Sequence, residues 1–294
     1  MESMLRNKKT ILLFIAPAFI IFSVIVIVPV IYSVYYSFFK WNLVGSKTFI
    51  GITNFARLIQ QDDIFKEATK NTFLLMGISL LIEIPFAILI ALAISGKIKG
   101  KRYFKTVLFM PNILSSVAIG LMWTFIYNPD FGIINRFLNF IGLENMAKLW
   151  LSEEKTVLPS IIVVIVWQFI GYHMILFLAA IENIPSSLNE AAEIDGTNSW
   201  QKLRYITLPL LKPIIKIDAI LIATGSLRFF DLIYVMSSGG PNHKSEVLAS
   251  YMYIKSFRDM QYGYGSAISV ILLVLCLFVT FILNATLKSE DIQY

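Results

Sequence analysis

Residues 190–213 read EAAEIDGTNSWQKLRYITLPLLKP, a polar, helix-forming stretch between two long apolar runs. Ser187 precedes Glu190 by three residues, a capping-box spacing that predicts a helix starting just after Pro185. The Asp-Gly pair at 195–196 predicts the end of that helix, because glycine adopts the left-handed conformation at little cost. The first helix of this stretch is therefore only about two turns long.

A second short helix is predicted directly after the first. Asn198 and Ser199 can cap it, and its apolar positions run through Trp200 to Ile206 before Pro209 ends it. Isolated helices shorter than about 12–15 residues are marginal in water. The bent pair therefore needs a surface to pack on, which is typical of a docking element.

The composition indicates that the rest of the chain lies in a membrane. Hydrophobic residues make up 57% of the 294 residues, 23 of them are Phe, and the mean hydropathy is +0.71, which exceeds what a globular core of this length needs. A membrane-spanning helix needs about 20 mostly apolar residues, and six runs reach that length. The predicted spans cover about 11–36, 72–95, 106–127, 157–181, 214–236 and 265–287.

Charge predicts the orientation of these spans. The short loop at 96–105 contains five bases and no acid, and the N-terminal tail adds Arg6, Lys8 and Lys9. Positive residues favour the cytoplasmic side, and an even number of spans puts both termini on one side. We therefore expect cytoplasmic termini and a cytoplasmic loop at 182–212. The net charge of +6 needs no nucleic-acid partner, because the bases that cluster do so at the membrane edge.

The 190–213 stretch resembles the EAA loop of the permease subunits of binding-protein-dependent ABC importers. The family pattern is Glu-Ala-Ala, then Asp-Gly after two residues, then Ile-x-Leu-Pro about ten residues on. The residues that match it are Glu190, Ala191, Ala192, Asp195, Gly196, Ile206, Leu208 and Pro209. The chain departs at Thr197 and Leu203, where the family usually has a small Ala and an aromatic residue. A helical surface can absorb both changes, so they affect fine affinity rather than identity.

The resemblance implies an all-α integral membrane protein with six transmembrane helices, the type I ABC importer permease fold, in one domain over 1–294. It implies that the loop at 182–212 inserts into a cleft of an ATPase subunit, with Glu190 as a polar anchor and Gly196 as the bend. It also implies four kinds of partner: a second permease in a heterodimer, two ATP-binding cassette subunits, an extracytoplasmic solute-binding protein and membrane lipid. The location would be a bacterial or archaeal plasma membrane.

Further segments resemble the maltose-type carbohydrate subgroup of that family. They are FDLIYVM at 230–236 with SSGGP at 237–241, FIGITNF at 49–55 and LFMP at 108–111. The resemblance implies import of sugars or related polyols by the larger-partner type of permease. Its sugar-facing positions, the predicted substrate pathway, fall on Asn112, Ser116, Trp167, Gly171, Thr224 and Gly225. The small residues among them can equally serve as helix-packing contacts.

Charged residues inside the predicted spans need partners, because charge is costly in hydrocarbon. Arg228 and Asp231 are three residues apart, which would put them on one helical face as an ion pair. Lys216 and Asp218 lie close enough to the inner boundary to snorkel. Glu83 lies deeper, and we expect helix packing rather than catalysis for it.

The sequence offers no catalytic or metal-binding motif. No stretch matches G-x-x-x-x-G-K-[ST], so ATP and Mg²⁺ would be used by the partner ATPase and no cofactor bound by this chain. There is one cysteine, Cys276, and the two histidines, His173 and His243, are isolated in sequence. We therefore predict neither an enzyme nor a metal site.

Other classes of membrane protein remain open. A secondary transporter of a small polar solute would usually show internal repeats with broken helices around buried charges, and no convincing repeat is present. A membrane enzyme would need distant residues to converge into a catalytic site. An ABC importer permease for a substrate other than a sugar is the third alternative.

Overall fold

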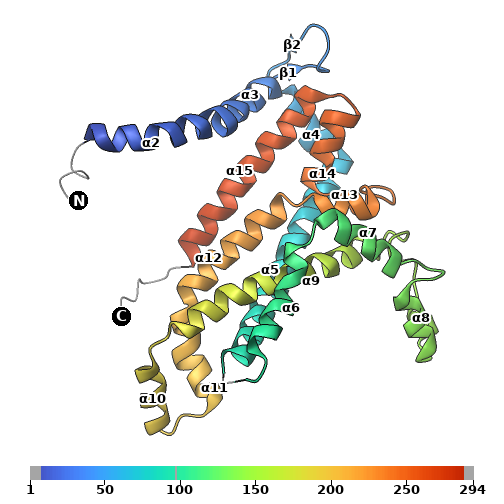
Figure 1. Ribbon diagram of the computed structural model, residues 1–294. Helices are drawn as coiled ribbons and strands as arrows, with labels where there is room; N and C mark the ends of the chain where they lie inside the picture. Colours follow the sequence, from blue (N-terminus) through green and yellow to red (C-terminus); the bar gives the residue numbers. More distant parts are fainter. Residues whose placement is uncertain (1–7, 97, 288–294) are drawn as a thin grey trace. The chain divides into compact units, whose positions relative to one another are not determined.

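The computed structural model describes residues 8–96 and 98–287, which are mostly helical (Figure 1). The chain divides into two compact units. The first comprises the residues up to Asp62 together with Met252–Ile271, and the second comprises Asp63–Tyr251 together with the residues from Leu272 on. The predicted orientation also depends on Arg6, Lys97 and both termini, which lie outside the described residues.

The first unit begins with one long helical run. α2 (Lys8–Phe22), a π-helical turn η1 (Ser23–Ile27) and α3 (Val28–Ser37) follow each other without a break. Short strands β1 (Phe39–Lys40) and β2 (Thr48–Phe49) pair antiparallel, and α4 (Thr53–Gln61) follows them. The buried Asn54 amide donates to the main-chain oxygens of Ser37 and Phe39, at 2.8 and 3.0 Å, and so joins these elements.

The second unit holds most of the helices. In chain order they are α5 (Asp63–Ser95), α6 (Lys101–Ile113), α7 (Ser116–Ile126), α8 (Ile133–Phe140), η2 (Glu144–Met146), α9 (Val157–Glu182), α10 (Ser186–Ile194), α11 (Ser199–Lys202), η3 (Leu203–Thr207), α12 (Leu208–Leu227) and α13 (Asp231–Ser237). The remaining helices, α14 (Leu248–Tyr253), η4 (Ile254–Arg258) and α15 (Tyr262–Thr286), continue the chain, and residues of α14 and α15 belong to both units.

α9 is the central helix of the second unit. It packs against α5, α6 and α12, and α5 also packs against α12 (Figure 1). A helix that is apolar on all sides is buried, either among other helices or in the lipid of a membrane. More than half of its apolar stretch is buried, including the side chains of Ile161, Val164, Met174 and Phe177. The site described below is built around this helix.

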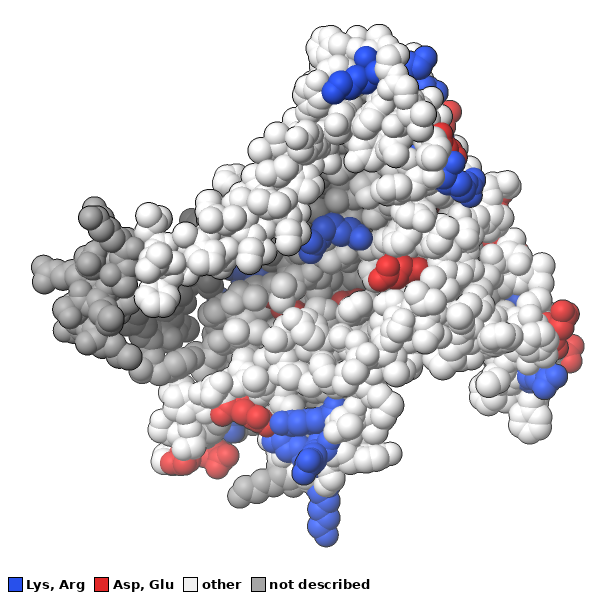
Figure 2. All heavy atoms as spheres, turned by 45° about the horizontal axis from the view of Figure 1, so that its top comes forward, with Lys and Arg blue, Asp and Glu red and all other residues white. Residues whose placement is uncertain are grey.

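The structure bears out most of the predicted spans. Over the described ranges, four helical segments are long and apolar enough to cross a membrane: Ile11–Ser37, Asp63–Ser95, Val157–Glu182 and Tyr262–Thr286. They correspond to the runs predicted at 11–36, 72–95, 157–181 and 265–287. Large apolar side chains remain exposed on these helices, and Figure 2 shows broad areas without charged side chains on the face in view. These surfaces suit contact with lipid or with other helices.

Two of the six predicted spans are not single helices. The run at 106–127 is the pair α6 and α7, bent by 96° where Leu114 and Ser115 are extended, and it counts as a span only if the bent pair is one. The run at 214–236 breaks after Leu227 and resumes at Asp231. The six-span count is therefore not reproduced: the described residues contain four spans, or five with the bent pair.

Candidate functional site

The loop between α9 and α12 folds into two short helices, as predicted (Figure 1). α10 begins at Ser186, directly after Pro185, but no side chain caps it, so the capping box expected from Ser187 and Glu190 is not formed. Glu190 is exposed instead. The start of α10 was therefore predicted correctly, but the predicted capping box was wrong.

α10 ends in a Schellman motif. The Thr197 amide donates to the Ala192 oxygen at 3.0 Å, the Gly196 amide donates to the Glu193 oxygen at 3.1 Å, and Gly196 has φ of +70°. The Thr197 hydroxyl donates to the same Ala192 oxygen at 2.7 Å. Gly196 thus forms the left-handed stop that the sequence predicts.

α11 begins with a complete capping box. The Gln201 amide donates to Asn198 Oδ1 at 2.9 Å, and the Asn198 amide donates to Gln201 Oε1 at 2.8 Å. Asn198 is therefore the cap that the sequence predicts, and Ser199 is the first helical residue. The two ends of the bend between α10 and α11 are both closed by hydrogen bonds within the loop.

The second helix of the loop does not end before Pro209, contrary to the sequence prediction. α11 continues through the π-helical turn η3 into α12, and Pro209 lies in the first turn of α12. Proline lacks an amide hydrogen, and the wider turn supplied by η3 lets the chain pass this position without breaking the helix. The loop is therefore directly continuous with α12.

The loop exposes large apolar side chains. Ile194, Trp200 and Tyr205 are 86%, 65% and 71% exposed. Of the eight residues that match the family pattern, Ala192 is buried, Ile206, Leu208 and Pro209 are half-buried, and the other four (Glu190, Ala191, Asp195 and Gly196) are exposed. An apolar surface on so small an element is typical of an interaction site.

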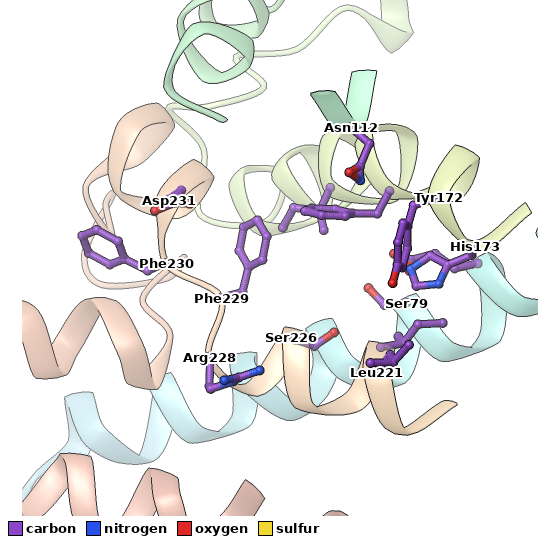
Figure 3. Close-up of a pocket in the computed structure, with 15 residues that line it drawn as sticks. Ser79, Asn112, Tyr172, His173, Leu221, Ser226, Arg228, Phe229, Phe230 and Asp231 are labelled. Carbon is purple, nitrogen blue, oxygen red and sulfur yellow. The ribbon is translucent and has the colours of Figure 1, made fainter. Parts of the chain in front are cut away.

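A cavity of about 410 Å³ lies in the second unit (Figure 3). Its lining residues are Ser79, Glu83, Asn112, Ile165, Phe169, Tyr172, His173, Leu221, Ile222, Gly225, Ser226, Arg228, Phe229, Phe230 and Asp231. They come from α5, α6, α9, α12, the segment after α12, and the start of α13. The cavity therefore offers aromatic faces beside amide, hydroxyl and charged groups.

Only two of the six predicted pathway residues, Asn112 and Gly225, line this cavity. The Ser116 hydroxyl accepts a hydrogen bond from Gln168 Nε2 at 3.3 Å. Thr224 donates to its own helix, at the Ile220 oxygen.

The remaining two predicted positions make packing contacts. The Trp167 ring packs edge-on against Trp123, at 5.5 Å between ring centroids. Gly171 lies against the α6 backbone, in the packing role left open for it.

A buried polar cluster lies at one end of the cavity. His173 on α9 contacts two carboxylates, with 2.6 Å from Nδ1 to Asp218 Oδ1 on α12 and 3.1 Å from Nε2 to Glu83 Oε2 on α5. The three side chains are at most 6% exposed. We refer to these three residues as the imidazole cluster.

The imidazole cluster was not predicted from the sequence. Asp218 was expected to snorkel at the inner membrane boundary, whereas its side chain is fully buried. Helix packing was correctly expected for Glu83. The available signal was that each residue interrupts an apolar run, which is costly unless polar partners lie on neighbouring helices.

The expected ion pair between Arg228 and Asp231 is absent among the described residues. The residues between α12 and α13 are not helical, so a three-residue separation does not put the two side chains on one face. Arg228 Nε donates instead to the Thr224 oxygen at 3.1 Å. Figure 3 shows both side chains at the end of the cavity away from His173.

These features define a multi-pass helical membrane protein with a folded loop between two central helices. The chain belongs to the family described as "Binding-protein-dependent transport system inner membrane component", which matches residues 83–288. It is 34% identical to the probable ABC transporter permease protein YurN of Bacillus subtilis, over 92% of this chain and 94% of the relative. The fold is that of a type I ABC importer permease.

Two further comparisons concern relatives whose substrates are named. The chain is 32% identical to the lactose transport system permease protein LacF of Rhizobium radiobacter, over 92% of this chain and 91% of the relative. It is also similar to a chain in the crystal structure of a bacterial alginate ABC transporter in complex with an alginate pentasaccharide-bound periplasmic protein. That similarity has a TM-score of 0.82, with 26% identity over 95% of this chain and 94% of the other.

Proposed function

We propose that this chain is the membrane subunit of an ATP-driven, binding-protein-dependent sugar importer. The observation that carries the proposal is the folded loop of residues 186–207, which matches the family pattern and presents exposed Ile194, Trp200 and Tyr205. A short element with exposed apolar side chains, set between α9, which is long and apolar enough to span a membrane, and α12, suits insertion into a groove of another protein. The loop is the surface that an ATPase subunit would grip.

The proposed assembly contains a second, similar permease, two ATP-binding cassette subunits and an extracytoplasmic solute-binding protein. The relative solved with a periplasmic protein supports the last of these partners. ATP and Mg²⁺ would be used by the cassette subunits, and this chain would bind no cofactor of its own. The exposed apolar surface of Ile11–Ser37 suits lipid and the second permease.

The loop would transmit ATPase movement through α9 and α12. α10 follows α9 after three residues, and η3 runs directly into α12. Closure of the ATPases would move the loop, with Glu190 as a polar anchor and Gly196 as the bend, and the two helices would carry this motion into the bundle. The bundle would then rock from inward-facing to outward-facing.

A saccharide is the substrate class that the cavity supports. Sugars are held by aromatic faces against their C–H faces and by polar groups on their hydroxyls. Tyr172 and Phe229 supply aromatic rings and Asn112 supplies an amide (Figure 3), and Phe169 adds a third ring. Gly225 leaves room beside them, since no described residue has an atom within 4 Å of where its side chain would be. The predicted pathway of Asn112, Ser116, Trp167, Gly171, Thr224 and Gly225 remains part of this proposal.

The proposed location is the plasma membrane of a bacterium or archaeon, with both termini and the loop in the cytoplasm. The five bases of residues 96–105 support this orientation. Two of them, Lys101 and Lys105, lie in the first turns of α6 and contact Glu182 at the end of α9, at 2.8 and 3.2 Å. These ion pairs join the start of α6 to the end of α9, next to the point where the loop begins.

Affinity purification of this chain from its native membrane in mild detergent, followed by mass spectrometry, tests the assembly. We expect an ATPase and a second permease to be retained. A solitary chain that transports in liposomes without ATP would replace this proposal with a secondary transporter. ATP-driven uptake of a solute other than a sugar would keep the importer and refute only the substrate class.

The variant Gly196→Asp tests the loop within that assembly. The new negative charge at the C-terminal end of α10 opposes the helix dipole, and a side chain at φ of +70° adds a smaller cost, because Asp, like Asn, tolerates this conformation better than most residues. We expect ATP hydrolysis to continue while uptake is lost, with normal membrane insertion. Normal uptake would count against the role of the loop.

A further inference from the structure

The imidazole cluster is a charged contact among three helices. Glu83 belongs to α5, His173 to α9 and Asp218 to α12, and all three side chains are buried. Only the protonated imidazolium can donate from both ring nitrogens, because neutral imidazole has one donor and one acceptor. The observed geometry, with a carboxylate at each nitrogen, therefore fits the protonated form when both carboxyl groups are ionised.

The two contacts of His173 depend on the number of protons that the imidazole cluster holds. An imidazolium and two carboxylates together carry one net negative charge, and removing one further proton leaves two negative charges in the interior of the bundle. Neutral His173 could donate to only one carboxylate, and its other nitrogen would present a lone pair to the second. One of the two interhelical contacts is then lost, since a buried charge without a partner is strongly destabilising. Asp218 Oδ2 already lacks a hydrogen-bond partner among the described residues.

The position of the cluster gives the contact a mechanical role. His173 lies nine residues before Glu182, the end of α9, and Asp218 lies ten residues after Leu208, the start of α12. At 1.5 Å per residue, each of the two residues is about 15 Å along its helix from the loop of residues 186–207. The cluster therefore joins the two helices that carry the loop to each other, and joins both to α5. Glu83 and His173 also line the cavity, from which water can exchange protons.

Few other charged groups surround the imidazole. The titratable and charged residues around it within the described ranges are Glu83 on α5, Asp218 on α12, Tyr172 on α9 itself, and Arg228 and Asp231 at the other end of the cavity. In the part of the chain that the structure describes, neither Arg228 nor Asp231 forms an ion pair with the cluster. The two carboxylates therefore govern the state of the imidazole.

We propose that His173 is a positioning residue that clamps α9 and α12 to α5 only while its imidazole is protonated, and that this clamp transmits loop movement to the cavity. The geometry alone supports the dependence of the contact on the proton of His173. Its effect on transport rests on the proposed import function. Release is a single deprotonation: the imidazolium gives one proton to cavity water and keeps the other N–H. The contact is present at low pH and is lost as pH rises through the titration of the cluster.

The first test measures solute transported per ATP hydrolysed by the complete importer in proteoliposomes, from about pH 5 to about pH 10. In the wild type we expect this ratio to be constant at low pH and then to fall, by at most about tenfold per pH unit for one proton. His173→Gln should give a low ratio at every pH. Glu83→Gln should give a ratio that no longer falls, because its amide can donate to the neutral imidazole nitrogen.

His243→Gln is the matched control, since His243 is the only other histidine and also contacts a carboxylate, Glu246, at 3.1 Å. The control should keep the wild-type pH profile. A merely structural role would lower the ratio in Glu83→Gln and leave any pH dependence in place. Either that result or loss of the pH dependence in His243→Gln would overturn the clamp.

The second test does not depend on the substrate. Solid-state NMR of ¹⁵N-histidine-labelled complex, taken as a difference from His173→Gln, isolates the His173 ring. We expect two protonated nitrogens at low pH and a titration in the range where the transport ratio falls. A neutral ring throughout would refute the clamp even if sugar import is established. A protonated ring in a complex that imports no sugar would refute the substrate class and leave the clamp standing.

Discussion

Gly171 of α9 lies directly against the main-chain carbonyl of Leu108 in α6, so that a side-chain carbon at this position would collide with the α6 backbone. Small residues permit such close approach between membrane helices. The helix pair α6 and α9 is therefore held at a spacing that only glycine allows here. Gly225 on α12 differs, since no atom of residues 8–96 or 98–287 lies within 4 Å of the corresponding position.

Gly171→Ala should destabilise the second unit. Backbone atoms cannot move aside as a flexible side chain can, and overpacking typically costs about 1–3 kcal/mol. Thermal unfolding of the purified complex in detergent measures the effect. Gly225→Ala should unfold at or slightly above the wild-type temperature, because its methyl group enters open space and Ala favours the helix over Gly. Equal melting temperatures for the two variants would contradict the close approach of α6 and α9.

Gly196→Val should uncouple ATP hydrolysis from uptake, whereas Gly196→Asn should largely retain coupling. The left-handed conformation costs an ordinary residue about 1–2 kcal/mol, and Asn tolerates it better. Among the residues that the structure describes, none has an atom within 4 Å of the added carbon, so the difference would come from the backbone and not from a clash. Uptake per ATP in proteoliposomes compares the two. The Schellman stop would have no role in coupling if both variants behaved alike.

Asn198→Ala should loosen α11. It removes the side-chain oxygen that accepts the Gln201 amide, and loss of such a cap costs about 0.5–2 kcal/mol. Hydrogen exchange of the amides at 199–202 should become faster. Asn198→Ser is the control, since a hydroxyl can take over the acceptor role. Unchanged exchange in Asn198→Ala would mean that another group orders this turn.

Asn71→Ala should destabilise the packing of α5 against the segment before α14. The Asn71 amide donates to the main-chain oxygens of Lys244 and Glu246, at 3.0 and 2.9 Å, and the residue is 3% exposed. Buried acceptors left without a donor cost about 1–3 kcal/mol. Chemical unfolding should show the loss, while exposed Asn139→Ala should show none. Similar stability in both variants would mean that water replaces the amide.

The features that could be predicted from the sequence are those with a local cause. The Asp-Gly stop at Gly196 and the cap at Asn198 depend on residues within a few positions, and both form as predicted. Four long apolar runs likewise become continuous helices. The capping box at Ser187 failed although its spacing was suitable, because α10 is entered from Pro185 without a side-chain cap.

The features that could not be predicted depend on residues far apart in the chain. His173 and Asp218 are 45 residues apart, and only the packing of α9 against α12 brings them to 2.6 Å. The break after Leu227 separates Arg228 from Asp231, which a periodicity argument would pair. Which of the six predicted pathway residues line the cavity also depends on tertiary features, among them the bend between α6 and α7 and the packing of Gly171 against α6.

Hydrogen bonds within the loop of residues 186–207 shape its bend. They are the Schellman bonds donated by Thr197 and Gly196 and the reciprocal pair between Asn198 and Gln201. A segment that is ordered before it meets its partner loses little conformational entropy on binding. In the proposed assembly, the loop would therefore move as a rigid body with the ATPase subunit that binds it. Movement of its binding partner would be converted into displacement of α9 and α12, with little absorbed by bending of the loop.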